Sequence, residues 1–396
     1  MTLQQNTDHI QTTHIGSLPR PHDLLDLLKA KYSGKPYDES QFNAVLTRSV
    51  AECVRQQVAS GIEIVTDGEY SKPGFFTYVR ERFDGFESRP NQKLALFQKE
   101  VAAFPEYYAW YFKEAMMGGA ILPILPVVCT GPVKYKGEDK LAIDIANVKA
   151  AAKAAGLPDH HVFLPATAPS GVGLNEYYKT EEEYFHALAA ELNKEYRAIV
   201  AAGLLVQVDD PFLADIFVEP GLDDGQKKRR AEIYVEATNA ALRGIPAERV
   251  RFHTCYGINE GPRIHESSLA DIIPYVLEVN AGSYSFEAAN PRHEHEYHLF
   301  ERLKLPEGKV LCPGVITHAS NIVEHPEWIA ERIIRFANLV GRENVVATAD
   351  CGFSSQALYR TEVHSTVVWE KFKAMCEGAD IATRRLWGNR QGSISS

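Results

Sequence analysis

The stretch that decides the fold lies between residues 161 and 210 and contains HVFLPATAP (161–169), TEEEYFHALAAELNKEYRAIV (180–200) and LLVQVDD (204–210). Its middle segment begins with a capping box, because Thr180 is followed three residues later by Glu183. Apolar side chains then recur at helical spacing, at Phe185, Leu188, Leu192, Tyr196 and Ile199. The apolar flanking segments predict strands, so the stretch is a strand–helix–strand unit with two parallel strands.

The same alternation recurs along the chain. Eight segments are predicted to be strands, with helical patterns between most of them: 12–18, 62–69, 161–169, 204–210, 250–256, 283–288, 309–316 and 345–351. Eight such units predict an α/β fold, a (β/α)8 TIM barrel. We expect one domain over residues 1–396, with an ordered core from about 10 to about 385 and an extra hairpin at 121–136. An open doubly wound sheet is the alternative, but its dinucleotide-binding form is weakened because no G-x-G-x-x-G turn follows the first strand.

The composition of the chain indicates which kinds of molecule it binds and in which compartment it works. The 396 residues carry a formal net charge of −10, which argues against nucleic acid or a membrane as the main partner. The polar N-terminus lacks the apolar core of a signal peptide, and no apolar run is long enough to span a membrane. Six scattered cysteines do not form a secreted disulfide framework. These features favour a cytoplasmic enzyme of small molecules, with a homo-oligomer left open.

The most informative motif is Arg251-Phe-His253-Thr-Cys255, at the end of the fifth predicted strand. Residues i and i+2 of a strand share a face, so the imidazole and the thiol point the same way. This pair alone is also compatible with a core histidine beside a buried cysteine. A further cysteine, Cys351, ends the eighth strand, and the carboxyl ends of barrel strands meet at one rim. Three such ligands predict a zinc site.

Carboxylates and histidines also end the predicted strands. Glu287 could complete the zinc tetrahedron, leave when a substrate thiol arrives, or bond to neighbouring barrel groups. Glu69 and Asp209 could hold the ammonium group of an amino acid, or cap helices and loops. His318 is a possible acid or base, or a surface histidine. The run PRHEHEYH, which includes His293, His295 and His298, lies beyond a strand end, where some members could line the substrate mouth.

These motifs together resemble the catalytic half of cobalamin-independent methionine synthase. The matching pieces span nearly the whole chain and are THIGS (13–17), DGE (67–69), QVDDP (207–211), HTC (253–255), Glu287, PGV (313–315) with His318, and DCG (350–352). The resemblance implies zinc ligation by His253, Cys255, Glu287 and Cys351. It implies homocysteine contacts from Ile15, Ser17, Glu69 and Asp209, and it implies His318 as proton donor to the leaving group.

Two departures leave the second substrate open. Thr130-Gly-Pro-Val133 keeps the start of a folate-site motif of the family, but the tryptophan that accompanies it has no clear equivalent. The segments 285–296 and Asn259-Glu-Gly-Pro262 are similar instead to the epoxyalkane:coenzyme M transferases. Our first hypothesis is methyl transfer to homocysteine, giving methionine, from a methylated pterin or another donor. The alternatives are addition of a thiol to an epoxide, and a non-catalytic barrel that binds zinc or a thiol.

Overall fold

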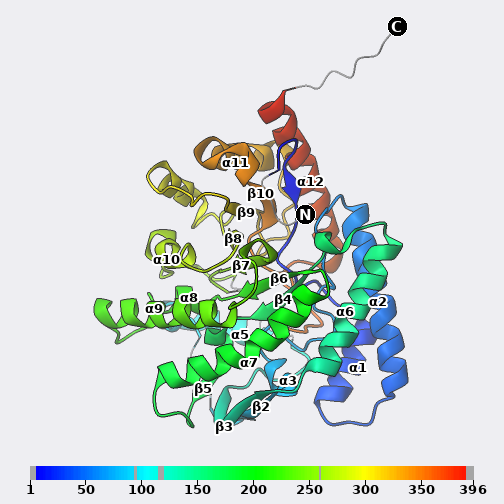
Figure 1. Ribbon diagram of the computed structural model, residues 1–396, viewed down its shortest axis with the longest axis vertical. Coiled ribbons are helices and arrows are strands. Elements are labelled where there is room, and N and C mark those ends of the chain that lie inside the picture. The colour runs from blue at the N-terminus through cyan, green and yellow to red at the C-terminus, as the bar shows by residue number, and fades with distance from the viewer. Residues whose placement is uncertain (1–5, 93–95, 115–119, 258–259, 389–396) are drawn as a thin grey trace.

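A curled parallel sheet forms the centre of the molecule (Figure 1), in a computed structural model that describes residues 6–92, 96–114, 120–257 and 260–388. Its strands lie in the order β1-β10-β9-β8-β7-β6-β4. Their bounds are β1 (Gln11–Thr12), β4 (Phe163–Thr167), β6 (Leu205–Asp209), β7 (Val250–His253), β8 (Ser283–Phe286), β9 (Val310–Ile316) and β10 (Val346–Ala349). Seven of the eight predicted strands are therefore present among the described residues, and each has fewer residues than predicted.

The remaining predicted strand, 62–69, is reduced to a bridge between the two edge strands. The backbone N–H groups of Glu63 and Ile64 both donate to the Thr12 carbonyl oxygen at 3.2 Å. Val65 donates to the carbonyl of His161 at 2.9 Å and accepts from Phe163 at 3.0 Å. The ladder goes no further, because the Thr66 N–H turns to the side chain of Gln57. Residues 63–65 thus connect β1 with β4 by backbone hydrogen bonds.

Helices cover the outer side of the sheet (Figure 1). The long ones are α1 (His22–Tyr32), α2 (Glu39–Ala59), α6 (Glu138–Ala154), α7 (Glu181–Ala201), α9 (Asp224–Ala241), α11 (Pro326–Val340) and α12 (Ser365–Trp387). The shorter ones are α3 (Val79–Arg82), α4 (Gln98–Ala103), α5 (Pro105–Glu114), α8 (Phe212–Asp215) and α10 (Leu269–Val276). Short 3-10 helices are η1 (Asp159–His161), η2 (Pro169–Gly171), η3 (Ala247–Arg249), η4 (Glu294–Glu301) and η5 (Arg342–Asn344).

The helix boundaries follow the signals in the sequence. The Thr180 side chain accepts a hydrogen bond from the N–H of Glu183 at 3.1 Å, which caps α7 as predicted. Pro326 is the first residue of α11, and Gly341 ends that helix with a φ of 94°. None of the helices in the described ranges is long and apolar enough to cross a membrane.

A second, smaller sheet corrects the expected hairpin at 121–136. That segment supplies one strand, β3 (Val127–Tyr135), whose antiparallel partner is the distant β2 (Phe83–Ser88). The very short β5 (Leu174–Asn175) pairs with β3 in parallel. Residues 121–126 include Pro123 and Pro126, which have no N–H to donate, so this half of the segment cannot form a regular second strand.

The inside of the curled sheet is filled by side chains. One apolar layer consists of Ile64, Phe163, Leu205, Val310, Cys312 and Val346, all almost fully buried. The guanidinium of Arg251 lies 3.9 Å from the centre of the Phe163 ring. It donates to the Thr13 hydroxyl and to the His14 carbonyl, both at 2.9 Å. Arg251 therefore connects β7 with the N-terminal segment across the interior of the sheet.

Gly16 is the tightest backbone position near this interior. Its φ is 131°, and a Cβ built on it would lie 2.7 Å from Cγ of Pro165. We expect Gly16→Ala to lower the free energy of unfolding by about 1–3 kcal/mol, because both the backbone conformation and the contact oppose a side chain. Urea unfolding followed by circular dichroism measures the change.

Gly34→Ala is the matched control. Gly34 also has a positive φ, 68°, but no atom of the described residues lies within 4 Å of the added Cβ. We expect this variant to be the more stable of the two, because φ near 60° is accessible to side-chain-bearing residues at modest cost. Equal losses in both variants would contradict a role for the close approach to Pro165.

Candidate active site

A cavity of about 670 Å³ opens at the carboxyl ends of the parallel strands. Its walls include seven of the residues singled out in the sequence: Ile15, Ser17, Glu69, Asp209, His253, Cys255 and Cys351. Asp209 ends β6, His253 ends β7, and Cys351 follows β10 by two residues. The volume suits a small-molecule site, and the position is where parallel α/β folds place catalysis.

His253, Cys255 and Cys351 form a compact group. Their ligand atoms lie within 4.8 Å of one another, and the two Sγ atoms are 3.3 Å apart. All three residues are buried. Nδ1 of His253 lies 3.2 Å from the Ser285 hydroxyl, whereas its Nε2 has no hydrogen-bond partner among the described residues. An unpartnered buried imidazole nitrogen beside two thiols is the arrangement that a metal ion would complete.

The electrostatics of this group also fit a cation. Burial lowers the pKa of His253 to about 3, so its imidazole is neutral and can offer a lone pair. The neighbouring Cys351 and burial raise the pKa of the Cys255 thiol well above its usual range. Two adjacent thiolates therefore need a positive ion to stabilise them. One imidazole and two thiolates fit zinc.

Glu287 lies in a different group from these three. Its carboxylate accepts hydrogen bonds from Nη2 of Arg263, the side-chain amide of Asn290 and the N–H of Tyr256. Although burial opposes its ionisation, Arg263 lowers the pKa of Glu287 to about 2. Its ligand atom lies within 4.8 Å of those of His318 and Asp350. The assignment of Glu287 as a zinc ligand stays a prediction.

His318 is fully enclosed beside Glu287 and does not line the cavity. Neither of its ring nitrogens has a hydrogen-bond partner within the described part of the chain. Burial lowers the pKa of His318 to about 4. Asp350 accepts the N–H groups of Ala288 and Ala289 at 2.8 Å, while burial and Glu287 raise its pKa to about 7. The role of His318 as a proton donor stays a prediction.

Glu69 and Asp209 bring two buried carboxylates to the cavity wall. Glu69 has a φ of 59°, and its N–H donates to the Asp67 carboxylate at 2.9 Å. Its Oε2 has no hydrogen-bond partner among the residues that the structure describes, and it lies 3.5 Å from Nζ of Lys72. Burial and the nearby Glu69 raise the pKa of Asp209 well above its usual range. Repulsion between these carboxylates favours binding of a cationic group between them.

The loop at residues 15–17 is fixed next to these carboxylates. The Gln207 side-chain amide donates both to the Ile15 carbonyl and to the Asp209 carboxylate. Ser17 approaches the backbone of Gly352 so closely that a Cβ there would lie 2.0 Å from the Ser17 hydroxyl oxygen. The conformation of this loop therefore depends on β6 and on the segment that carries Cys351.

Several other polar residues near the site contact the protein and not the cavity. Arg20 donates to the backbone carbonyls of Glu69, Lys72 and Ser354, so it joins loops. Within the PRHEHEYH run, His293 is buried in ion pairs, His295 and His298 are exposed, and none of the three lines the cavity. Asn259 lies outside the described residues.

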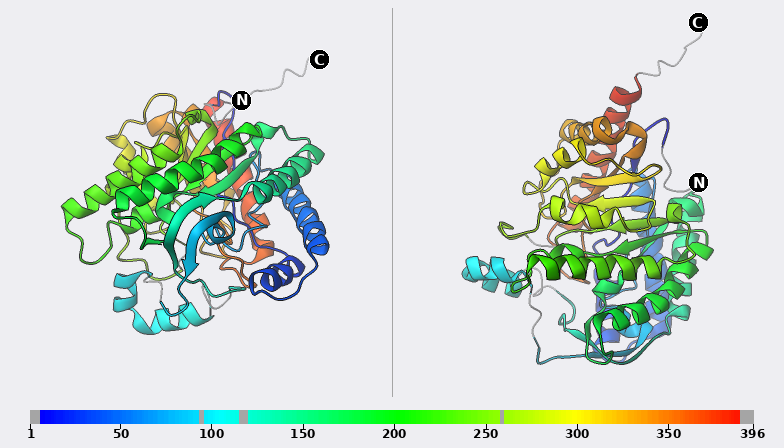
Figure 2. Two further views of the ribbon diagram at one scale, coloured as in Figure 1. Left: turned by 60° about the horizontal axis from the view of Figure 1, so that its bottom comes forward. Right: turned by 60° about the vertical axis from the view of Figure 1, so that its left-hand side comes forward.

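Sequence reasoning missed several residues that shape the site. Arg263 lies in a loop without periodicity, and no local pattern indicated its contact with Glu287. Phe75, Phe76 and Phe212 form an aromatic cluster in the cavity wall, with ring centroids 5.0–6.3 Å apart. Phe97 contributes from the segment at α4 and α5, which projects from the body of the molecule (Figure 2). The adjacent Phe75 and Phe76, next to Gly74, were the available signal for an aromatic loop.

Known proteins are similar to this chain in sequence and in architecture. A methionine synthase of Thermococcus kodakarensis is 25% identical over 393 residues, which cover 98% of this chain and 96% of that protein. A methionine synthase of Saccharolobus solfataricus is 24% identical over 382 residues, covering 95% and 96%. A B12-independent methionine synthase from Shewanella sp. W3-18-1, solved with selenomethionine, superimposes with a TM-score of 0.72 at 19% identity, covering 96% of this chain and all of that one.

The family assignment rests on a match over more than half of the chain. Residues 148–371 match the family described as the catalytic domain of cobalamin-independent synthase. This segment includes β6 to β10 and with them Asp209, His253, Cys255 and Cys351. The chain belongs to the cobalamin-independent synthase catalytic-domain family.

Proposed function

We propose that the chain is a zinc-dependent methyltransferase that converts homocysteine to methionine. The observation that carries this proposal is that His253, Cys255 and Cys351 share one cavity with the carboxylates of Glu69 and Asp209. The first group suits a metal that binds a thiol, and the second suits an ammonium group. Homocysteine has both. Relatives named methionine synthase match the chain over nearly its full length, which supports the same reaction.

The scaffold of this proposal is a single (β/α)8 barrel domain over residues 1–396. Residues 63–65 supply the eighth strand position, since they hydrogen-bond to β1 on one side and to β4 on the other. Closure brings residues 15–17 and Glu69 to the same rim as the ends of β6, β7 and β10. The two parts of the site therefore face one another.

Zinc bound at His253, Cys255 and Cys351 would supply a thiolate nucleophile at neutral pH. Glu69 and Asp209 would bind the amino group, and the Ile15–Ser17 segment would bind the carboxylate. The aromatic wall of Phe75, Phe76 and Phe212 would exclude water from the reacting sulfur. The sulfur would gain the methyl group, and the donor would leave with the electron pair of the broken bond and take up a proton, which balances the one that the thiol loses on binding zinc.

The alternative thiol, coenzyme M, fits these residues less well. Its sulfonate would lie close to the carboxylates of Glu69 and Asp209, and like charges in a buried site repel strongly. The similarity to coenzyme M transferases concerns segments 285–296 and 259–262, and none of the described residues in these segments lines the cavity. The carboxylate pair therefore favours an amino-acid thiol as acceptor.

We expect Cys351→Ser to lose zinc and thiol binding together, because a hydroxyl replaces a thiolate ligand. The loss of zinc affinity should exceed the roughly 10- to 100-fold that removal of an outer-shell partner costs. Zinc content by mass spectrometry and homocysteine-dependent proton release measure the two effects. Cys376→Ser, at a half-buried cysteine outside the cavity, is the control and should keep both properties. Full proton release from zinc-free Cys351→Ser would contradict the proposal.

We expect Asp209→Asn to weaken homocysteine binding by about 10- to 100-fold, the range for a hydrogen bond to a charged group. The same variant should bind 4-mercaptobutanoate, which lacks the amino group, as well as the unchanged enzyme does. Titration of the cobalt-substituted protein with each thiol, followed by absorption, gives both affinities. Coenzyme M is titrated in the same way as a third thiol.

Glu181→Gln is the matched control for this titration, because Glu181 also lines the cavity but lies at the start of α7. Its affinity for homocysteine should not change. Preference of the unchanged enzyme for coenzyme M over homocysteine would contradict the proposed substrate while leaving the metal site intact.

A further inference from the structure

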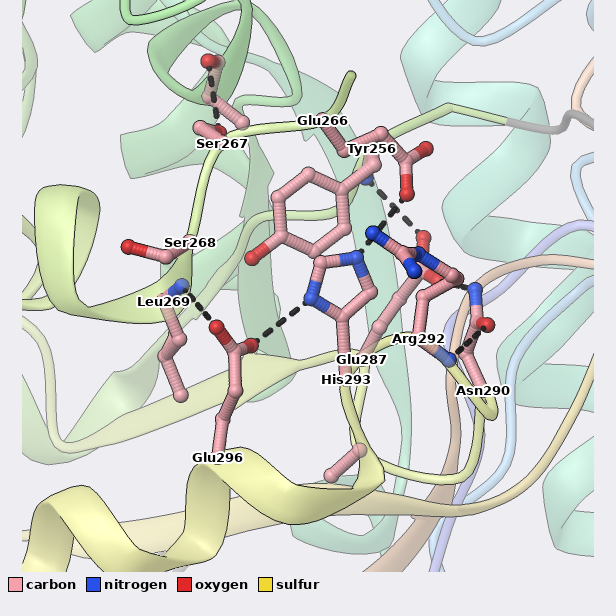
Figure 3. Close-up of polar contacts among 12 residues, drawn as sticks. Tyr256, Glu266, Ser267, Ser268, Leu269, Glu287, Asn290, Arg292, His293 and Glu296 are labelled. Carbon is pink, nitrogen blue, oxygen red and sulfur yellow. Dashed lines mark hydrogen bonds and ion pairs between the residues drawn. The ribbon is translucent and has the colours of Figure 1, made fainter. Parts of the chain in front are cut away.

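Glu287 ends a chain of alternating charges that extends away from the metal site. Arg263 donates through Nη2 to Oε2 of Glu287 at 2.9 Å and through Nε to Glu266 at 2.6 Å. Glu266 also contacts Nε2 of His293 at 3.0 Å, and Nδ1 of His293 contacts Glu296 at 2.8 Å. Figure 3 shows His293 between these two carboxylates. Three carboxylates thus alternate with two cationic side chains.

All five side chains of this charge network are buried, so each charge needs an opposite charge beside it. No side chain in it is more than 10% exposed. Although burial opposes protonation, Glu266 and Glu296 raise the pKa of His293 to about 9, so the imidazole is charged. Removing one partner from such a set leaves an uncompensated charge in the interior. Each member therefore holds its neighbours in place.

The same contacts fix the segment after β7 that carries Cys255. Tyr256, the next residue, stacks on His293 with ring centroids 4.0 Å apart and an interplanar angle of 6°. Its N–H donates to Oε1 of Glu287 at 3.0 Å. Arg263 itself has a φ of 58°, a left-handed conformation that persists in a non-glycine residue when surrounding contacts compensate for its strain.

Both carboxylate oxygens of Glu287 already accept hydrogen bonds from the protein. Oε1 accepts from the Tyr256 N–H and from Arg263 at 3.1 Å. Oε2 accepts from Arg263 at 2.9 Å and from the Asn290 amide at 3.0 Å. Nη2 of Arg263 makes both of its contacts, so three donor groups hold the carboxylate, and a metal would have to displace at least one of them. Two thiolates and a neutral imidazole already balance the charge of Zn²⁺ without Glu287.

We propose that Arg263 is a positioning residue that withholds Glu287 from the metal, so that the described residues supply three ligands, His253, Cys255 and Cys351, and the fourth position is left for the substrate thiol. This inference rests on the proposed function, since it concerns the same metal site. It differs from the ligand set that the family resemblance implies, because Arg263 occupies the carboxylate that would complete it.

The test compares zinc affinity, by competition with a chelator, and the absorption spectrum of the Co²⁺ form. Glu287→Gln should leave the Co²⁺ spectrum unchanged, because a non-ligand has been altered, although the unpaired Arg263 should lower zinc affinity within the roughly 10- to 100-fold range of a lost outer-shell partner. Arg263→Met should raise zinc affinity by about tenfold or more and change the Co²⁺ spectrum, because the freed Glu287 becomes a ligand. The double variant should return both to the starting values, and Arg263→Lys should keep them, because it retains the charge.

Arg82→Met is the matched control. Arg82 is an equally buried arginine that pairs with Asp144 and Glu195, and its loss should not alter the Co²⁺ spectrum. If Arg263→Met does not fold, Glu287→Gln alone decides. A changed Co²⁺ spectrum in Glu287→Gln, whatever its zinc affinity, would overturn the inference and leave the proposed function standing. If the unsubstituted protein binds no zinc, both the inference about Arg263 and the proposed function are wrong.

Discussion

The parallel register of β6, β7 and β8 is the constraint on which the site depends. Asp209 is paired with His253 across one ladder, and His253 with Ser285 across the next. Parallel strands end at the same edge, so this register brings a carboxylate, an imidazole and a hydroxyl together without any further adjustment. Shifting β7 by one residue would turn His253 and Cys255 to the opposite face. The cysteine after β10 joins them only because the sheet curls.

Charge compensation divides the buried polar groups near the cavity into two kinds. Glu287, Glu266 and His293 have their counter-charges supplied by the chain itself. The thiols of Cys255 and Cys351, and the carboxylates of Glu69 and Asp209, are more weakly compensated by protein. Burying a charge without a partner is costly, so a folded protein keeps such groups where a ligand can supply the missing charge. The second kind therefore lies at the proposed metal and substrate positions, and the first kind does not.

The sequence predicted those parts of the molecule that depend on local pattern. Alternation of strand and helix located seven strands, and the capping box at Thr180 located the start of α7. The i, i+2 spacing of His253 and Cys255 placed both in one cavity. In each case the physical determinant is the backbone period or the capping hydrogen bond of a few neighbouring residues, which the sequence records directly.

The parts that were missed depend on long-range contacts. Residues 62–69 have the composition of a strand, yet Gln57 takes the N–H of Thr66 and the ladder stops. The partner of β3 is β2, about forty residues earlier, which a hairpin reading of 121–136 could not anticipate. Arg263 has no periodic signal, and only the folded chain shows that it lies against Glu287.

The contact between Arg263 and Glu287 also bears on how the site would treat a thiol. A site made of two thiolates, a neutral imidazole and Zn²⁺ has no net charge, so an incoming thiol can lose its proton there with little opposition. A fourth anionic ligand would add a negative charge and would have to leave before the thiol could bind. Arg263 holds Glu287 in a buried ion pair from the moment the protein folds. The thiol therefore does not have to displace Glu287 from the metal each time it binds. The proposed site would then have an open coordination position ready for the thiol but would bind zinc more weakly. Such a compromise is expected where substrate binding matters more than metal affinity.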